Sequence, residues 1–191
     1  FFRQCTSYSK CLPLTNALHH DFLPFIPVKP SRVLDIGAGI GRDAYEFWKM
    51  GHWVMAVEPL VDFREAGQRL YPSAAIEWRD DALPQLPTLI KDAPQFDFIL
   101  ASGIWHHLNP AEQAEALANI SKLLLPQGSF ALSLRNGPAG VGTHVFPTNV
   151  QQTINDAKMY DLHPVLRLEN QASLIRNKKE VYWAKLVFSK K

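Results

Sequence analysis

The sequence has few cysteines and no long apolar run. Its two cysteines, Cys5 and Cys11, are too few for a disulfide scaffold, and free thiols in a reducing compartment are the simpler expectation. Even with His19 and His20 nearby, they make only a weak set of ligands, so we expect no metal site. No apolar stretch approaches the roughly 20 residues that span a bilayer, so we expect no membrane segment.

The chain also lacks a strong excess of charge of either sign. Its 20 basic and 18 acidic side chains give a net charge of +2, which does not by itself predict a nucleic-acid partner. The first residues lack the charged-then-apolar order of a signal peptide, so we expect a cytoplasmic protein. The 191 residues suit one domain with a sizeable core. We place this domain at residues 31–191, after an N-terminal segment of residues 1–30.

A glycine-rich stretch lacks the spacing of a dinucleotide-binding fingerprint. That fingerprint has glycine at its first, third and sixth positions, and the sixth position counted from Gly37 is Arg42. The stretch lies between a short apolar strand, residues 32–36, and a helical pattern over residues 42–50. Such a strand, turn and helix can hold an adenosine-containing cofactor, because glycine lets the backbone approach a ligand and the helix N-terminus offers N–H donors. The pattern that is present reads Asp35-x-Gly37-x-Gly39-x-Gly41.

This pattern resembles motif I of the class I S-adenosylmethionine-dependent methyltransferases. The resemblance extends from about Val33 to Phe188 and includes the order Leu-x-Pro-x-Gly at residues 124–128. It implies an α/β, Rossmann-like three-layer sandwich. The implied sheet has seven strands in the order 3-2-1-4-5-7-6 and is mostly parallel, with strand 7 antiparallel. It also implies S-adenosylmethionine as the cofactor, whereas an ordinary strand-to-helix turn is the alternative.

Apolar runs and breakers predict the elements of this sheet. Capping boxes are predicted at Asp62-x-x-Glu65 and at Asn109, where Glu112 follows three residues later. They open two of the helices, and another is expected over residues 149–160. The strands are expected at residues 32–36, 52–59, 74–78, 96–101, 129–134, 164–169 and 180–188.

Acidic residues stand where the first three strands end, and ligands of open α/β sheets bind outside these carboxyl ends. Asp35 can act on the cofactor or order the glycine loop. Glu58 can accept hydrogen bonds from both ribose hydroxyls, a geometry that serves NAD and S-adenosylmethionine alike; a solvent-exposed acid is the alternative. After the third strand, the resemblance implies an acid that accepts from the adenine amino group and a neighbouring N–H that meets a ring nitrogen.

The pair Asp81-Ala82 fits that position, with Asp80 as the alternative acid, while solvated loop acids are the simpler interpretation of both. The predicted cofactor-binding residues are Asp35, Gly37, Ala38, Gly39, Arg42, Glu58, Pro59, Asp80, Asp81, Ala82 and Ser102.

The acceptor is expected to bind among residues 1–30, 102–108 and 135–147. The second of these stretches resembles the family's loop after the fourth strand, which carries His. If a base is used, His106 or His107 is the candidate, because imidazole titrates near neutral pH. Stacking on adenine or satisfying a loop carbonyl are their alternative roles. Candidate substrate contacts are Trp105, His144 and, for an anionic acceptor, Arg135.

The segment 1–30 has apolar residues at near-helical spacing between residues 14 and 25. The resemblance implies a helical lid over the cofactor site. A helix that only covers the core is the alternative.

The sequence thus predicts an S-adenosylmethionine-dependent methyltransferase that acts by in-line displacement, as a monomer or homodimer. A small-molecule acceptor is favoured, because the compact chain has little room for a recognition domain; nucleic acid or protein acceptors stay open. The Asn/Asp-Pro-Pro-aromatic signature of many amide and base methyltransferases is absent. Alternatives are a non-catalytic cofactor-binding partner or sensor, and a nicotinamide-dependent oxidoreductase, which Arg42 and the closing hairpin disfavour.

Overall fold

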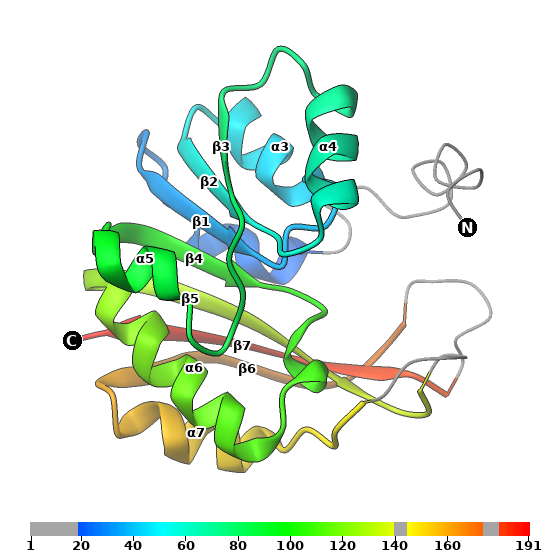
Figure 1. Cartoon of the computed structure of the whole chain (residues 1–191). Coiled ribbons are helices and arrows are strands. Elements are labelled where there is room, and N and C mark those ends of the chain that lie inside the picture. The colour runs from blue at the N-terminus through cyan, green and yellow to red at the C-terminus, as the bar shows by residue number, and fades with distance from the viewer. Residues whose placement is uncertain (1–18, 140–144, 174–179) are drawn as a thin grey trace.

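One seven-stranded sheet organises the chain, as Figure 1 shows for this computed structural model. The structure describes residues 19–139, 145–173 and 180–191. The strand order is β3-β2-β1-β4-β5-β7-β6. The first five strands in this order pair in parallel, and β7 is antiparallel to both β5 and β6. The predicted fold class, strand order and antiparallel seventh strand are therefore confirmed.

The elements alternate along the chain as expected for parallel strands joined by helical crossovers. The strands are β1 (Arg32–Ile36), β2 (Trp53–Val57), β3 (Ile76–Arg79), β4 (Phe96–Ala101), β5 (Leu124–Asn136), β6 (Leu162–Ala172) and β7 (Tyr182–Lys190). The helices are η2 (His20–Phe25), α3 (Arg42–Lys49), α4 (Val61–Leu70), α5 (Pro87–Asp92), η3 (Trp105–His107), α6 (Pro110–Leu123) and α7 (Val150–Lys158).

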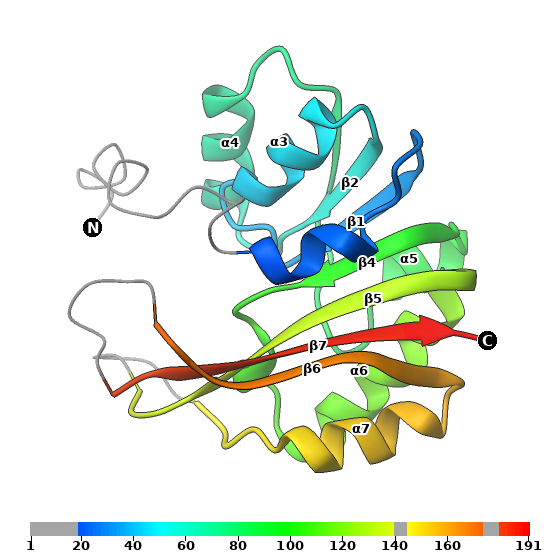
Figure 2. The same cartoon turned by 180° about the vertical axis from the view of Figure 1, so that it is seen from behind.

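The central strands β1, β2 and β4 are buried on both faces, because their side chains alternate between the two sides of the sheet and helices cover both sides. Leu34 and Ile36 of β1 pack in a core cluster with residues of α5, α6 and α7. Val33 points the other way, into a cluster with Phe22 of η2 and Phe47 of α3. The two views show these helix layers on opposite faces (Figures 1 and 2). This packing holds the ends of β1 in the centre of the molecule.

Two local predictions meet different outcomes. Asn109 forms the predicted capping box: its side chain accepts from the N–H groups of Ala111 and Glu112, and the Glu112 carboxylate accepts from the Asn109 N–H at 2.7 Å. The box predicted at Asp62 is wrong. The carbonyl of Leu60 accepts from the N–H groups of Phe63 and Arg64, so α4 begins one residue before Asp62.

Strand β5 begins earlier than predicted, and α5 was not predicted at all. Leu124 pairs with Phe96 of β4, which draws the chain into the sheet directly after α6. Elsewhere the observed bounds of β1 and β4 equal the predicted ones. The tertiary pairing therefore decides where β5 starts.

The N-terminal segment enters the described structure at residue 19, and residues 1–18 lie outside it. Two side-chain contacts fix its first turn: His19 lies within hydrogen-bond distance of the Asp43 carboxylate of α3 at 3.1 Å, and Asp21 forms an ion pair with Lys185 of β7 at 2.7 Å. Between them, Phe22 is buried and η2 lies over the face that α3 also covers (Figure 2). The part of the predicted lid helix that the structure describes is this 3-10 helix, which contains Pro24.

Candidate functional site

Three loops meet where β1, β2 and β3 end. Because these strands are adjacent and parallel, the residues that follow them gather at one edge of the sheet. Strand β1 lies between β2 and β4, so the chain order reverses beside it. Such a reversal is where open α/β sheets bind ligands.

The three glycines of the loop after β1 all adopt positive φ angles. Gly37, Gly39 and Gly41 have φ values of +71°, +56° and +78°. The N–H groups of Gly37 and Ala38 donate to the Val57 carbonyl at 2.8 and 2.9 Å, which joins the ends of β1 and β2. A Cβ on Gly37 would lie 2.5 Å from Ile104, whereas one on Gly39 would have no described atom within 4 Å. Among the described residues, Gly39 therefore borders open space.

Asp35 orders the start of α3. Its carboxylate is buried and accepts from the N–H of Ala44 at 3.1 Å. Burial raises the pKa of Asp35 well above its usual range, and the carboxylate of Asp43 raises it further. Of the two predicted roles, this geometry favours ordering the glycine loop.

Glu58 is buried and held at four points. Its two carboxylate oxygens accept from the N–H groups of Gly39 at 2.9 Å and Leu60 at 3.0 Å. Its main-chain N–H donates to Arg79 and its carbonyl accepts from Arg64. A carboxylate offers about four acceptor positions. Within the described part of the chain, acceptor capacity thus remains on both oxygens, next to the open side of Gly39.

The structure separates the two predicted adenine-side acids. Asp81 is buried and caps α5, accepting from the N–H groups of Thr88 and Leu89 at 2.9 and 3.0 Å and from the Thr88 hydroxyl. Its other oxygen accepts from the N–H of Ala82. Asp80 has a side chain 69% exposed and pairs with Arg64 at 2.9 Å. Because Asp81 is used inside the fold, the geometry favours Asp80 for contact with a ligand.

The histidine pair follows β4. His106 is buried and its carbonyl accepts from the N–H of Phe146, whereas His107 is exposed. The ring centroids of the two histidines are 4.2 Å apart. The ring centroid of Trp183 lies 6.4 Å from that of His106, and these two rings are T-shaped to each other. Ser102, nearby, has its hydroxyl 3.4 Å from that of Ser133 in β5. Of the two candidate bases, His107 is therefore the one that is exposed to solvent.

The side chains predicted to contact the substrate are less accessible than His107. Trp105 is fully buried and packs against Phe130 of the core. Arg135 is also buried, and its guanidinium donates to the carbonyls of Gly137 and Pro138, which fixes the exit of β5. Both side chains are occupied within the fold, and His144 lies outside the described residues. Arg42 and Pro59 both lie at the predicted edge. Arg42 is half-buried in the first turn of α3, and Pro59 is exposed directly after Glu58.

A family profile described as a methyltransferase domain matches residues 33–128, half of the chain. The chain belongs to the methyltransferase domain family. The predicted relationship to the class I S-adenosylmethionine-dependent methyltransferases is thereby confirmed. The matched residues run from the second residue of β1 into β5, and they include the glycine loop, Glu58 and the histidine pair of η3.

Curated relatives of the methyltransferase domain match over part of their length. An uncharacterised methyltransferase of Geobacillus kaustophilus is 32% identical over 101 residues, which are 53% of this chain and 45% of that protein. An uncharacterised methyltransferase of Mycobacterium tuberculosis is 27% identical over 114 residues, 56% of this chain and 41% of that protein. The chain thus spans less than half the length of these relatives.

Solved structures share the fold of the methyltransferase domain. A 1,6-didemethyltoxoflavin N1-methyltransferase of Burkholderia thailandensis has a TM-score of 0.71 at 22% identity, covering 96% of this chain and 80% of that one. A TehB-like S-adenosylmethionine-dependent methyltransferase of Corynebacterium glutamicum has a TM-score of 0.71 at 18% identity, covering 99% and 95%. At these identities the likeness establishes the fold.

Two side chains of the methyltransferase domain's edge escaped sequence reasoning. Arg64 bridges the loops after β2 and β3, and Trp183 of β7 reaches the histidine pair. The sequence does carry a signal for Arg64. It is a basic residue about one turn into the helix that follows Glu58, the acid at the end of β2. Trp183 has no local signal, because only the sheet order brings β7 beside β5.

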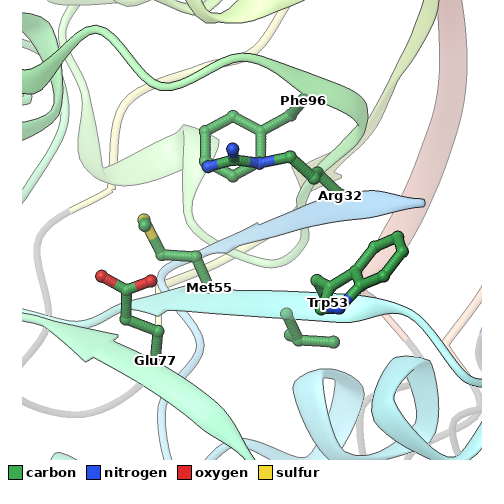
Figure 3. A pocket seen from close by; sticks show the side chains of 6 residues that line it. Arg32, Trp53, Met55, Glu77 and Phe96 are labelled. Carbon is green, nitrogen blue, oxygen red and sulfur yellow. The ribbon is translucent and has the colours of Figure 1, made fainter. Parts of the chain in front are cut away.

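A groove of about 490 Å³ lies at the opposite end of the strands. Arg32, Trp53 and Phe96, which begin β1, β2 and β4, line it with Met55 and Glu77. Figure 3 shows the Arg32 guanidinium over the Phe96 ring, 5.7 Å from its centroid. This groove is therefore separate from the edge that carries Glu58.

The described residues hold neither a metal cluster nor a membrane span. None of their helices is long and apolar enough to cross a membrane. No group of three or more His, Cys, Asp or Glu among them is arranged to hold a metal ion. Cys5 and Cys11 lie outside the described residues.

We expect Asp35→Asn to weaken the pH dependence of stability. The folded state raises the pKa of Asp35 and so binds its proton more tightly than the unfolded chain does. The free energy of unfolding therefore falls as pH rises from the ordinary carboxyl pKa through the raised folded value. Asn has no proton to lose, and its amide oxygen can still accept from the Ala44 N–H.

The difference in melting temperature, Asp35→Asn minus wild type, should thus be larger at about pH 8 than at about pH 4. Thermal unfolding at both pH values measures this, with Asp62→Asn, an exposed residue of α4, as the control. A difference from wild type that is equal at both pH values would contradict the assignment.

Proposed function

We propose that this methyltransferase domain binds S-adenosylmethionine at the edge formed by β1, β2 and β3, and transfers its methyl group to a small-molecule acceptor. One observation carries the proposal: the buried Glu58 carboxylate is fixed by two backbone N–H groups, with acceptor capacity left beside the open side of Gly39. A fixed acceptor of this kind suits the paired hydroxyls of a ribose. Family membership supports the choice of cofactor.

The predicted residues fit the cofactor at three places. Glu58 would accept from the ribose hydroxyls, and Asp80 would accept from the adenine amino group. Gly39 would let the backbone approach the ligand, because a side chain there would enter the open space. Gly37, Ala38 and Asp35 act indirectly by holding the loop between β1, β2 and α3.

The cofactor supplies a methyl group that is already activated by its sulfonium. The chain therefore has to orient the acceptor and exclude water. Ser102 and the exposed His107 follow β4 and would face the acceptor, and His106 next to them contacts the Trp183 ring. His107 would take a proton from an acceptor that needs activation.

The N-terminal segment, residues 1–30, is proposed to cover this site, with residues 31–191 as the domain itself. What supports this is the His19–Asp43 pair, which fixes the segment to α3 directly after the glycine loop. A cytoplasmic location completes the proposal, supported by the scarcity of cysteine in the chain.

A small-molecule acceptor is supported by two observations. The chain has a net charge of only +2, which gives it no strong attraction to a nucleic acid. The structurally similar enzyme from Burkholderia thailandensis was crystallised with 1,6-didemethyltoxoflavin and S-adenosylhomocysteine. A non-catalytic cofactor-binding sensor is the second candidate, favoured by the use of Trp105 and Arg135 inside the fold.

Formation of S-adenosylhomocysteine tests the proposal, measured with pools of small amines, heteroaromatics, phenols and thiols and, in parallel, with tRNA and denatured protein. We expect turnover with at least one small-molecule pool. Turnover with tRNA or protein alone would overturn the acceptor class, and cofactor binding without turnover in any pool would favour the sensor.

With an accepted pool in hand, His107→Gln should lower kcat by about 100-fold, the usual worth of a positioned base. His106→Gln, which changes the buried neighbour, is the matched comparison. An unchanged kcat in His107→Gln would show that this side chain is not the base.

A further inference from the structure

Arg64 of α4 lies between the ends of β2 and β3. Its Nη1 donates to the main-chain carbonyl of Glu58 at 2.6 Å. Its Nη2 pairs with the Asp80 carboxylate at 2.9 Å. The Arg64 side chain is 15% exposed and that of Asp80 is 69% exposed, so the guanidinium end of the bridge is covered by protein and the carboxylate end is open. One guanidinium thus contacts both loops that carry the predicted polar contacts to the cofactor.

Among the described residues, one backbone hydrogen bond joins these two loops directly beside the Arg64 contacts. The pairing of β2 with β3 ends at Val57 and Arg79, and the Glu58 N–H adds one bond to the Arg79 carbonyl at 3.2 Å. Strand β3 is short and lies at the edge of the sheet, paired with β2. Asp80 therefore leaves the sheet where strand pairing no longer holds it, and the Arg64 contact takes over.

We propose that Arg64 is a positioning residue for the adenosine half of the cofactor. It fixes the separation between Glu58, on the ribose side, and Asp80, on the adenine side. The inference rests on the proposed function and adds a residue that touches neither the ribose nor the adenine. S-adenosylmethionine, S-adenosylhomocysteine and 5′-methylthioadenosine share that half. The loss of Arg64 therefore weakens the binding of all three ligands to the same degree.

The guanidinium is suited to this task. Its planar fork donates from two nitrogens in fixed directions, whereas the Lys ammonium is a compact point charge on a flexible stem. Arg64→Lys keeps the charge and much of the stem but does not span both acceptors. Arg64→Met keeps the apolar stem and removes both contacts. Arg69→Met is the matched control, because Arg69 lies on the same helix in an exposed pair with Glu65 at 3.3 Å.

Calorimetric titration of the full chain with each of the three ligands tests the inference. We expect Kd to rise about tenfold for all three in Arg64→Met, which corresponds to about 1.4 kcal/mol. Arg64→Lys should lie between Arg64→Met and wild type, and Arg69→Met should stay within about twofold of wild type. Thermal unfolding of each variant shows whether it is folded during the titration.

The outcomes separate the inference from the proposed function. If wild type binds none of the three ligands, the proposed function fails. If wild type binds and Arg64→Met binds equally well, the inference alone fails. A loss for S-adenosylmethionine but not for 5′-methylthioadenosine would also overturn it, because that loss would lie in the methionine half. If Arg64→Met does not fold, Arg64→Lys carries the test, and wild-type affinity in that variant overturns the inference.

Discussion

Glu58→Ala should raise the Kd for S-adenosylmethionine by at least about 100-fold, because hydrogen bonds to a charged group are worth about 1.5–3 kcal/mol each. The variant loses the acceptors proposed for both ribose hydroxyls. It also leaves the N–H groups of Gly39 and Leu60 without their carboxylate partner, so the glycine loop is less well fixed. Isothermal titration calorimetry measures the affinity, and thermal unfolding reports the accompanying loss of stability.

Two further variants isolate the role of the carboxylate. Glu58→Gln keeps one oxygen acceptor and the shape of the side chain, so its affinity should fall between those of Glu58→Ala and wild type. Glu65→Ala removes an exposed acid from α4 and should bind as wild type does. If Glu58→Ala retained wild-type affinity, the ligand would bind elsewhere and the site would have to be abandoned.

Gly37→Ala should mainly lower stability, whereas Gly39→Ala should mainly lower the affinity for the cofactor. At Gly37 the φ of +71° is strained for any other residue, and a Cβ would lie 2.5 Å from the Ile104 side chain. We expect Gly37→Ala to lower the free energy of unfolding by about 2–4 kcal/mol, from backbone strain and overpacking together. Gly39→Ala carries backbone strain of about 1–2 kcal/mol without a contact to a described atom.

The affinities of these two variants should not follow their stabilities. A Cβ on Gly39 enters the space proposed for the cofactor, so Gly39→Ala should lose more affinity although it is the more stable variant. Urea unfolding and calorimetry on both proteins measure the two quantities. Gly39→Ala with normal affinity, beside a folded Gly37→Ala without affinity, would reverse the expected order and place the ligand on the other side of the loop.

The sequence was informative wherever chemistry and local pattern coincide. The glycine spacing after a buried strand predicted the loop, and an acid at the end of the next strand predicted Glu58 at the same edge. Parallel pairing then brings both together without further information. Asn109 with Pro110 and Glu112 is a similar local signal, and the predicted capping box forms.

The sequence does not reveal contacts whose partner lies elsewhere in the chain. Asp81 looked like a ligand contact, but its carboxylate caps α5, a short helix with no apolar periodicity of its own to reveal it. Trp105 follows β4 as a binding residue could, yet its ring packs on Phe130 of β5. Arg64 reads as an ordinary polar helix residue until β3 places Asp80 beside it.

The central claim is that this edge binds S-adenosylmethionine rather than a nicotinamide cofactor. Titration of the purified chain with S-adenosylmethionine by calorimetry, and with NADH by its fluorescence, tests it most directly. We predict micromolar binding of S-adenosylmethionine, lost in Glu58→Ala, and no binding of NADH. Binding of NADH without binding of S-adenosylmethionine would contradict it, because Glu58 would then serve the ribose of a different cofactor.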